Sequence, residues 1–239
     1  GEKNPVGRPK GSKNKPKEIA YTFQILAQLL QKWQELVIEL CDFLKVKHVV
    51  ADNGFGNESV RKICKDNGFE LISKLQKNSC LYFPDTSPYK TKPKKYGEKL
   101  CIQEIDEAFF VEERKEGETT QKIYQLPKIW HQYLRVPLNV VIIKSYSENK
   151  EGWCILFSTD SHLSAQEIMS LYQIRFKIEF DFRDAREHFG LTNFCNFKEN
   201  QVTNVIGNAF FMVCVSRIFA LNQSLQNPTA KFSIYNLKA

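Results

Sequence analysis

The first third of the chain alternates between helix-type and strand-type hydrophobic patterns. Apolar residues recur every three or four positions over residues 21–44, which predicts a long amphipathic helix. A short apolar run at 46–51 predicts a buried strand, and the run at 69–75 predicts a second strand. A helix over about 57–67, ended by an Asn-Gly pair, is predicted between them. A strand, a helix and a strand in this order indicate a βαβ unit with parallel strands.

The hydrophobic pattern changes over residues 78–158. Short β-rich runs alternate there with charged turns that contain Gly or Pro. The runs are 80–83, 109–113, 122–127, 138–144 and 154–158. This pattern predicts an antiparallel insertion within an α/β domain. Helical spacing returns at 164–188 and at 201–222, and Ser164 with Glu167 predicts a capping box for the first of these helices.

The positive charge is concentrated in two segments. The chain of 239 residues carries 34 Lys+Arg against 27 Asp+Glu, a formal charge of +7. Residues 1–17 hold six bases and one acid, and residues 86–99 hold five lysines and one acid, so the rest of the chain sums to −2. Two basic segments on a nearly neutral body indicate a polyanionic partner such as DNA.

The N-terminal basic segment contains a Gly-Arg-Pro core at Arg8. Such a core keeps the backbone slim and extended, so that the Arg can enter a narrow minor groove while Lys10 and Lys13 meet phosphates. The segment resembles an AT-hook, and the alternative is a solvated linker. The second segment interleaves lysines with tyrosines over 89–96, which indicates either a contact with a DNA backbone or a polar hairpin loop.

The overall composition narrows the class of protein. With 42% hydrophobic and 26% charged residues, it excludes disordered, collagen-like and coiled-coil chains. No run of about 18 apolar residues occurs, so we expect no membrane span. The basic N-terminus lacks the apolar core of a secretory signal. The seven cysteines are scattered singly, which favours reduced thiols in a cytosolic protein.

The helix predicted at 164–188 carries a polar stripe. Tyr172, Arg175, Glu179 and Arg186 stand at offsets 0, 3, 7 and 14, which places them within about 60° of one another on a helix. A carboxylate and two guanidiniums so aligned suit a metal ion and DNA phosphates. The alternative is a row of surface ion pairs, of which Arg175 with Glu179 is the most obvious.

An apolar stripe lies beside the polar one on the same helix, and we expect it to pack on a sheet. Its members are Leu171, Ile174, Ile178, Phe182, Ala185 and Phe189.

Asp52 follows directly after the strand predicted at 46–51. Open α/β sheets place their ligand-binding residues at this end of a strand. Asp52 and Glu179 are therefore candidates to converge on Mg²⁺, as the two-metal cleavage of a phosphodiester requires. The alternative for Asp52 is the N-cap of the helix predicted at 57–67. Asp184, Glu187 and His188 form a further candidate metal group, for which a solvated helix face is the simpler interpretation.

The spacing Tyr172-x2-Arg175-x3-Glu179-x6-Arg186 resembles the YREK signature of DDE transposases in the insertion-sequence-four family. The segment Val-Val-Ala-Asp52-Asn-Gly-Phe-Gly-Asn is similar to the one that carries the second catalytic Asp of that family. The segment 157–160 and the Gly-Arg-Pro-Lys linker also resemble family segments.

The resemblance implies an RNase H-like α/β fold with an antiparallel β-rich insertion between the second Asp and the Glu. It divides the chain into a basic linker at 1–20, a first RNase H-like part at 21–77, the insertion at 78–158, and a helical part with the catalytic helix at 159–239. It also implies cut-and-paste transposition of an insertion sequence, with metal-dependent cleavage of DNA strands followed by strand transfer.

The resemblance further assigns roles to the matched residues. Asp52 and Glu179 would bind Mg²⁺ or Mn²⁺ in a two-metal site, Arg175 and Arg186 would bind phosphates, and Tyr172 would contact DNA near the cut. The implied partners are double-stranded DNA, as transposon ends and target, and a second copy of the chain in an active homodimer. The implied location is the bacterial cytoplasm, in association with the nucleoid.

The chain departs from the family pattern in two ways. Position 186 is Arg where the signature usually has Lys, which keeps the charge but changes its geometry. The first catalytic Asp, which the family carries on its first strand upstream of the basic linker, is missing from this sequence, so we expect an incomplete RNase H-like fold without its first strands. The alternatives to an active transposase are a truncated, inactive remnant that only binds DNA and a metal-dependent nuclease of the same fold.

Overall fold

The computed structural model describes residues 21–40, 46–86, 95–148, 150–193 and 198–227. The chain divides into two compact units, one that ends at Ile168 and one that begins at Met169. Each unit is described by itself below.

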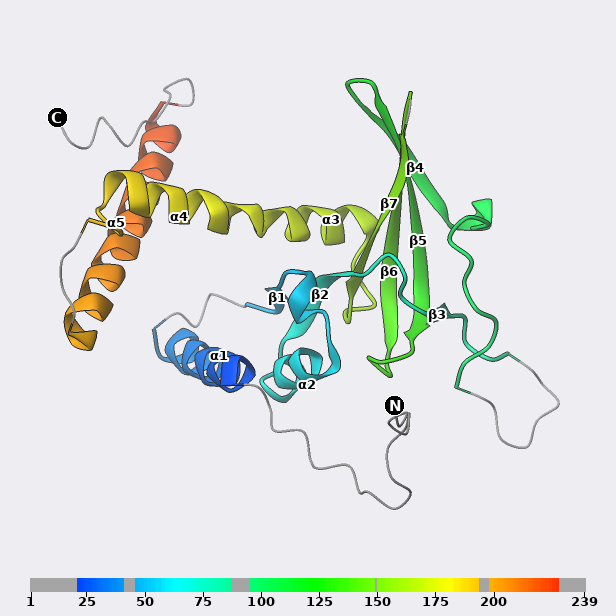
Figure 1. Cartoon of the computed structure of the whole chain (residues 1–239), viewed down its shortest axis with the longest axis horizontal. Helices are drawn as coiled ribbons and strands as arrows, with labels where there is room; N and C mark the ends of the chain where they lie inside the picture. The colour runs from blue at the N-terminus through cyan, green and yellow to red at the C-terminus, as the bar shows by residue number, and fades with distance from the viewer. Residues whose placement is uncertain (1–20, 41–45, 87–94, 149, 194–197, 228–239) are drawn as a thin grey trace, which may run out of the picture. The chain divides into compact units, whose positions relative to one another are not determined.

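The first unit is built on one mixed sheet (Figure 1). Among the described residues, seven strands join in the order β1-β2-β7-β6-β5-β3, and β4 pairs with β5. The strands are β1 (His48–Val50), β2 (Glu70–Leu75), β3 (Leu81–Tyr82), β4 (Phe110–Glu116), β5 (Thr119–His131), β6 (Pro137–Ser147) and β7 (Lys150–Ser158). The helical elements of this unit are α1 (Tyr21–Leu40), η1 (Asn53–Phe55), α2 (Glu58–Asp66) and η2 (Glu107–Phe109).

The predicted βαβ unit is confirmed. Strands β1 and β2 are parallel, with His48 opposite Glu70, and α2 connects them. Asn67 ends α2, and Gly68 follows it with a φ of 75°, a backbone conformation that favours glycine. The helix predicted at 21–44 is observed as α1, and its predicted last residues lie outside the described ranges.

The strands predicted within 78–158 are confirmed as antiparallel, and their pairing extends the same sheet. Strand β7 pairs with β2, with Ile72 opposite Ser158, and it also pairs with β6. The β-rich segment is therefore continuous with the βαβ unit through hydrogen bonds between strands. The sequence pattern does not reveal this continuity, and the four predicted domain limits stay predictions.

Strand β5 contains an irregularity that its sequence explains. Its register with β6 shifts between Leu126 and Ile129. Pro127 lacks an N–H to donate to the ladder, and Lys128 has a left-handed φ of 59°. A bulge of this kind bends a strand and locally strengthens its twist.

The hydrophobic core of the first unit lies between the sheet and its helices. Large side chains from several strands are fully buried, among them Leu71, Leu126, Ile142 and Phe157. The helices α1 and α2 lie side by side against this sheet (Figure 1). The packing fixes β1, and with it the loop that follows β1.

The second unit is helical. It contains most of α3 (Ala165–Ile174), together with α4 (Phe176–His188) and α5 (Glu199–Gln226). The single helix predicted at 164–188 is observed as two helices, because the backbone tightens at Arg175. There, Arg175 N–H donates to the Tyr172 carbonyl at 3.2 Å, and Ile178 N–H donates to the Arg175 carbonyl at 3.1 Å.

The apolar stripe of the 164–188 segment packs differently from its prediction. Ala185 is buried with Ala209 and Val213 of α5, and the rings of Phe182 and Phe210 lie 4.9 Å apart. The partner of this end of the stripe is thus α5, whereas Ile178 remains 52% exposed. The spacing of apolar residues shows which face of a helix is apolar, but it does not show which element packs against that face.

Helix α5 also bears on the predicted absence of a membrane span. By length and hydropathy alone, Glu199–Gln226 is long and apolar enough to cross a bilayer. Of the 18-residue apolar stretch within this helix, 17% is buried. Core helices of soluble proteins meet the same criterion. The expected absence of a membrane span stays a prediction.

Candidate functional site

Asp52 lies at the surface just beyond the end of β1. Its side chain is exposed, and Oδ1 accepts a hydrogen bond from the N–H of Asn53 at 2.8 Å. Its carbonyl oxygen accepts the N–H of Phe55 at 2.8 Å and the hydroxyl of Ser73 at 3.0 Å. The backbone of Asp52 is thus tied to β2, and its carboxylate caps η1 while facing solvent.

The alternative role for Asp52 as the N-cap of α2 is wrong. Asn57 occupies that position, and its Oδ1 accepts the N–H of Val60 at 3.1 Å. Its Nδ2 donates to the Gly54 carbonyl at 3.1 Å, which closes the loop between β1 and α2. Since Asn57 supplies the cap, α2 does not depend on the carboxylate of Asp52.

Gly56 sits where the loop after Asp52 touches β2. A Cβ at this position would lie 3.0 Å from the Lys74 carbonyl oxygen and 3.2 Å from Ser73 Oγ. Any larger residue would therefore push the loop away from the strand. A Cβ at Gly54 would meet no atom within 4 Å. Of the two glycines, only Gly56 is therefore required by the close approach of the loop to β2.

Replacing Asn57 by Ala is expected to lower the free energy of unfolding by about 1 kcal/mol, because the N–H of Val60 loses its acceptor. Urea denaturation followed by circular dichroism measures this change. Asn53→Ala is the matched control, since the Asn53 side chain has no hydrogen-bond partner within the described part of the chain. Equal losses in both variants would contradict the assignment of the cap.

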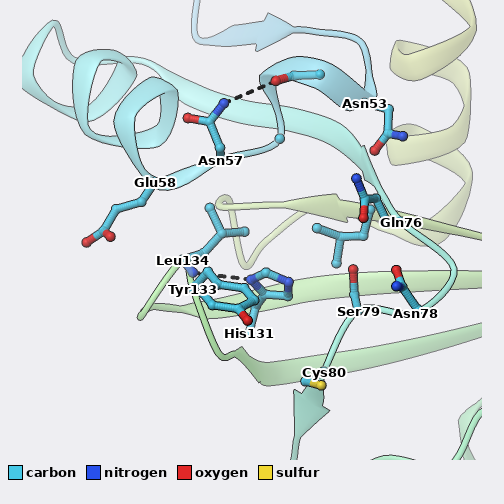
Figure 2. Close-up of a pocket in the computed structure, with 13 residues that line it drawn as sticks. Asn53, Asn57, Glu58, Gln76, Asn78, Ser79, Cys80, His131, Tyr133 and Leu134 are labelled. Atoms are coloured by element: carbon cyan, nitrogen blue, oxygen red, sulfur yellow. Dashed lines mark hydrogen bonds between the residues drawn. The ribbon is translucent and has the colours of Figure 1, made fainter. Parts of the chain in front are cut away.

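A hollow of about 490 Å³ opens beside this loop (Figure 2). Three segments line it, namely the β1–α2 loop with the first residue of α2, the β2–β3 connection and the β5–β6 turn. Its polar lining consists mainly of neutral side chains, and no Lys or Arg is among the lining residues. Figure 2 shows Gln76, Asn78 and Ser79 gathered in one part of the hollow and Tyr133 in another.

His131 forms the buried part of this lining. It is 6% exposed, and its Nδ1 accepts the N–H of Leu134 at 3.2 Å. Burial lowers the pKa of His131, so the imidazole is neutral at pH 7. Tyr133 is 67% exposed, and its ring meets that of His131 edge to face at 5.9 Å. The hollow therefore offers neutral hydrogen-bonding groups, the carboxylate of Glu58 and one exposed aromatic ring.

The predicted polar stripe begins at the junction of α3 and α4. Arg175 places its guanidinium 5.8 Å from the ring centre of Tyr172 and 4.4 Å from that of Phe176. Its Nη1 lies 3.4 Å from Oε1 of Glu179. Tyr172 is buried, whereas the side chain of Glu179 is 64% exposed. The stripe thus holds an arginine against aromatic rings and leaves its carboxylate accessible.

The remaining predicted site residues are distributed as follows. Arg186 is exposed in the last turn of α4. Asp52 belongs to the first unit and Glu179 to the second, so their binding of one metal ion stays a prediction. Arg8, Lys10 and Lys13 lie outside the described residues.

The candidate metal group at Asp184 is an ion-pair network. Asp184 is 2% exposed, and its Oδ2 lies 2.7 Å from Nη2 of Arg217 on α5. Its Oδ1 accepts from Arg183 at 3.2 Å. Within the described ranges, no group of three or more His, Cys, Asp or Glu residues has the arrangement of a metal site. The interpretation of this segment as a solvated face is also wrong for Asp184, which joins α4 to α5.

A buried carboxylate at the end of β7 was not predicted as a site residue. Asp160 is 4% exposed, and its Oδ2 lies 2.7 Å from Lys47 Nζ and 3.0 Å from His48 Nε2. Its Oδ1 accepts the N–H of His162 at 3.0 Å. Burial by itself would raise the pKa of Asp160, but these hydrogen bonds hold the pKa well below its usual range.

Two carboxamides hold the segment that follows Asp160. Asn139 donates to the Leu163 carbonyl at 2.7 Å, and Gln125 donates to the same oxygen at 2.9 Å. The predicted capping box is confirmed, since Glu167 accepts the N–H of Ser164 at 2.8 Å and donates its own N–H to Ser164 Oγ. The start of α3, the helix that leads toward Glu179, is thereby fixed to β5 and β6.

A comparison with protein families matches the transposase DDE domain over residues 14–215. The chain therefore belongs to the family of transposase DDE domains. A comparison with curated proteins gave no match. The mixed α/β architecture with a mostly antiparallel sheet is compatible with the RNase H-like fold of such domains. Membership implies transposase function, DNA as the partner, and the divalent metals that DDE domains generally use.

Proposed function

We propose that this chain acts as a DDE transposase of the insertion-sequence-four type, with Tyr172, Arg175, Glu179 and Arg186 as its YREK signature. It cleaves DNA strands at the ends of an insertion sequence and transfers them to target DNA. The observation that carries the proposal is the family match across both Asp52 and Glu179. The surface position of the Asp52 carboxylate, at the end of a strand in a mixed sheet, supports it.

Asp52 and Glu179 are the proposed ligands of Mg²⁺ or Mn²⁺ in a two-metal site. Both side chains are exposed carboxylates, and hard oxygen ligands of this kind suit these ions. Asp52 Oδ1 accepts the N–H of Asn53, and the side chain is exposed, so a metal ion can reach the carboxylate from solvent. When bound, the metal ions would supply the activation of the attacking oxygen and the stabilisation of the leaving oxygen.

The polar stripe contributes the contacts with DNA. Arg175 rests against Tyr172 and Phe176, so its guanidinium is restrained before a phosphate arrives, and little entropy is lost on binding. Arg186 is exposed and supplies a second bidentate donor.

The hollow beside Asp52 lies next to the loop that presents the Asp52 carboxylate. We propose that part of the DNA strand enters this hollow.

The proposed partners are transposon ends and target DNA, bound by a homodimer in the bacterial cytoplasm. Arg8, Lys10 and Lys13 belong to the N-terminal arm that we propose as an additional DNA contact. The alternative function is a DNA-binding module without cleavage activity.

Incubation of the chain with supercoiled plasmid and Mg²⁺ or Mn²⁺ is expected to give nicked and linear DNA, and chelation with EDTA is expected to abolish both products. Gel electrophoresis measures the conversion. Without bound metal ions the attacking oxygen has no activating cation. If the plasmid stays intact in both metals while binding of DNA persists and weakens with salt, the chain is the binding module.

A further inference from the structure

A second hollow, of about 230 Å³, lies along α2 in the first unit. Arg61 and Lys65 of α2 contribute two cations to its lining, and Glu70 and Thr159 are its other polar lining residues. The rest of the lining is apolar. No residue is shared with the hollow beside Asp52, so the two are separate features of the same unit.

The two cations have no counter-ion in the described part of the chain. Arg61 Nε is buried without a hydrogen-bond partner there. The side chain of Lys65 makes neither a hydrogen bond nor an ion pair with a described residue. Since residues four apart on a helix are neighbours, these like charges repel each other. A bound anion would relieve the repulsion and give the buried N–H an acceptor.

The acidic group in the wall is already engaged. Glu70 accepts a short hydrogen bond from the hydroxyl of Thr159. The neighbouring cation Lys47 is held by Asp160 at 2.7 Å, so it adds no free positive charge to the hollow. Two cations against one carboxylate leave the lining with net positive charge. The described lining of the hollow beside Asp52, in contrast, contains the acid Glu58 and no Lys or Arg.

We propose that the hollow of Arg61 and Lys65 binds a phosphate of the DNA backbone. The inference rests on the proposed function, because it takes DNA as the partner. A guanidinium and an ammonium on one helix face suit a phosphate, with the guanidinium as a bidentate donor. A volume of about 230 Å³ accommodates the phosphate and several waters, each of roughly 30 Å³.

Helix α2 connects this contact with the region of Asp52. Glu58, in its first turn, lines the hollow beside Asp52, and Lys65, in its last turn, lines the cationic one. Seven residues of helix span about 10 Å. A DNA strand that enters the first hollow therefore passes within reach of the second, and α2 sets the distance between the two contacts.

Arg61→Gln and Lys65→Gln are each expected to weaken binding of a fluorescein-labelled DNA duplex about five- to tenfold at 0.1 M salt and to reduce the salt slope by about one, as the loss of one phosphate contact predicts. Fluorescence anisotropy over a salt series measures both quantities. Lys62→Gln is the matched control, because Lys62 is an exposed lysine of α2 outside the hollow. Arg61→Lys keeps the charge and is expected to retain most of the slope.

Glu70→Gln provides a test in the opposite direction. It removes the acid of the wall while keeping an acceptor for Thr159, so DNA affinity is expected to rise two- to fivefold. Equal effects of Arg61→Gln and Lys62→Gln, in variants with unchanged circular dichroism, would overturn the proposal and leave the proposed function standing. If the unaltered chain binds inorganic phosphate at Arg61 and does not bind DNA, both are overturned.

Discussion

Glu179→Gln is expected to abolish metal-dependent cleavage of plasmid DNA, with a rate about a thousandfold lower, while affinity for DNA stays within about twofold. The amide is nearly isosteric with the carboxylate but carries no charge with which to bind a divalent cation. The side chain is 64% exposed, and its pair with Arg175 is a surface contact at 3.4 Å, so the fold is expected to persist. Nicking assays and anisotropy measure the two properties separately.

Glu187→Gln is the matched control for this prediction. Glu187 is an exposed glutamate of the same helix, outside the polar stripe, so its variant is expected to cleave at the rate of the unaltered chain. Asp52→Asn is expected to reproduce the loss seen with Glu179→Gln. The double variant should be no slower than either single one, since ligands of one metal site act as a unit. Retained cleavage in Glu179→Gln would remove Glu179 from the catalytic site.

Local patterns predicted the elements of the fold that depend on neighbouring residues. The apolar runs around His48 and Leu71 and the Asn67-Gly68 ending were sufficient for the βαβ unit, because strand burial and helix capping are local effects. The pairing of Ile72 with Ser158 joins residues far apart in sequence, and no local period encodes it. The break at Arg175 lies within an unbroken helical pattern, which therefore gave no sign of it.

The candidate site was predictable where position along a strand determines it. Asp52 was expected after a buried strand. It does follow β1, but β1 is an edge strand of the described sheet, and its three residues are only half-buried. The cap of α2 was assigned to Asp52 as an alternative because both Asp and Asn suit that role. Asn57 takes the cap because it directly precedes Glu58, the first residue of α2. Asp184 was misjudged because its partner, Arg217, lies on another helix, which a helical wheel of α4 does not include.

The ion pair of Asp160 with Lys47 belongs to the same class of contacts that sequence patterns do not reveal, since 113 positions separate the two residues. Asp160→Asn is expected to lower the free energy of unfolding at pH 7 by about 2 kcal/mol, because hydrogen bonds to a buried charged group are replaced by weaker ones. Lys47 is 56% exposed and stays solvated in the variant, which limits the loss. Urea denaturation measures it.

The pH dependence of this loss identifies its electrostatic origin. The hydrogen bonds from Lys47, His162 and His48 hold the pKa of Asp160 below that of an unfolded Asp, about 3.9, despite its burial. The carboxylate therefore stabilises the fold fully above the unfolded pKa. This stabilisation is lost progressively as the pH falls from the unfolded pKa through the folded pKa. At pH 3 the deficit of Asp160→Asn is expected to be about 1 kcal/mol smaller than at pH 7. The control is Asp106→Asn, at an exposed cap. An Asp160→Asn deficit that is equal at both pH values would show that packing, and not the charge of Asp160, holds the β7–α3 connection in place.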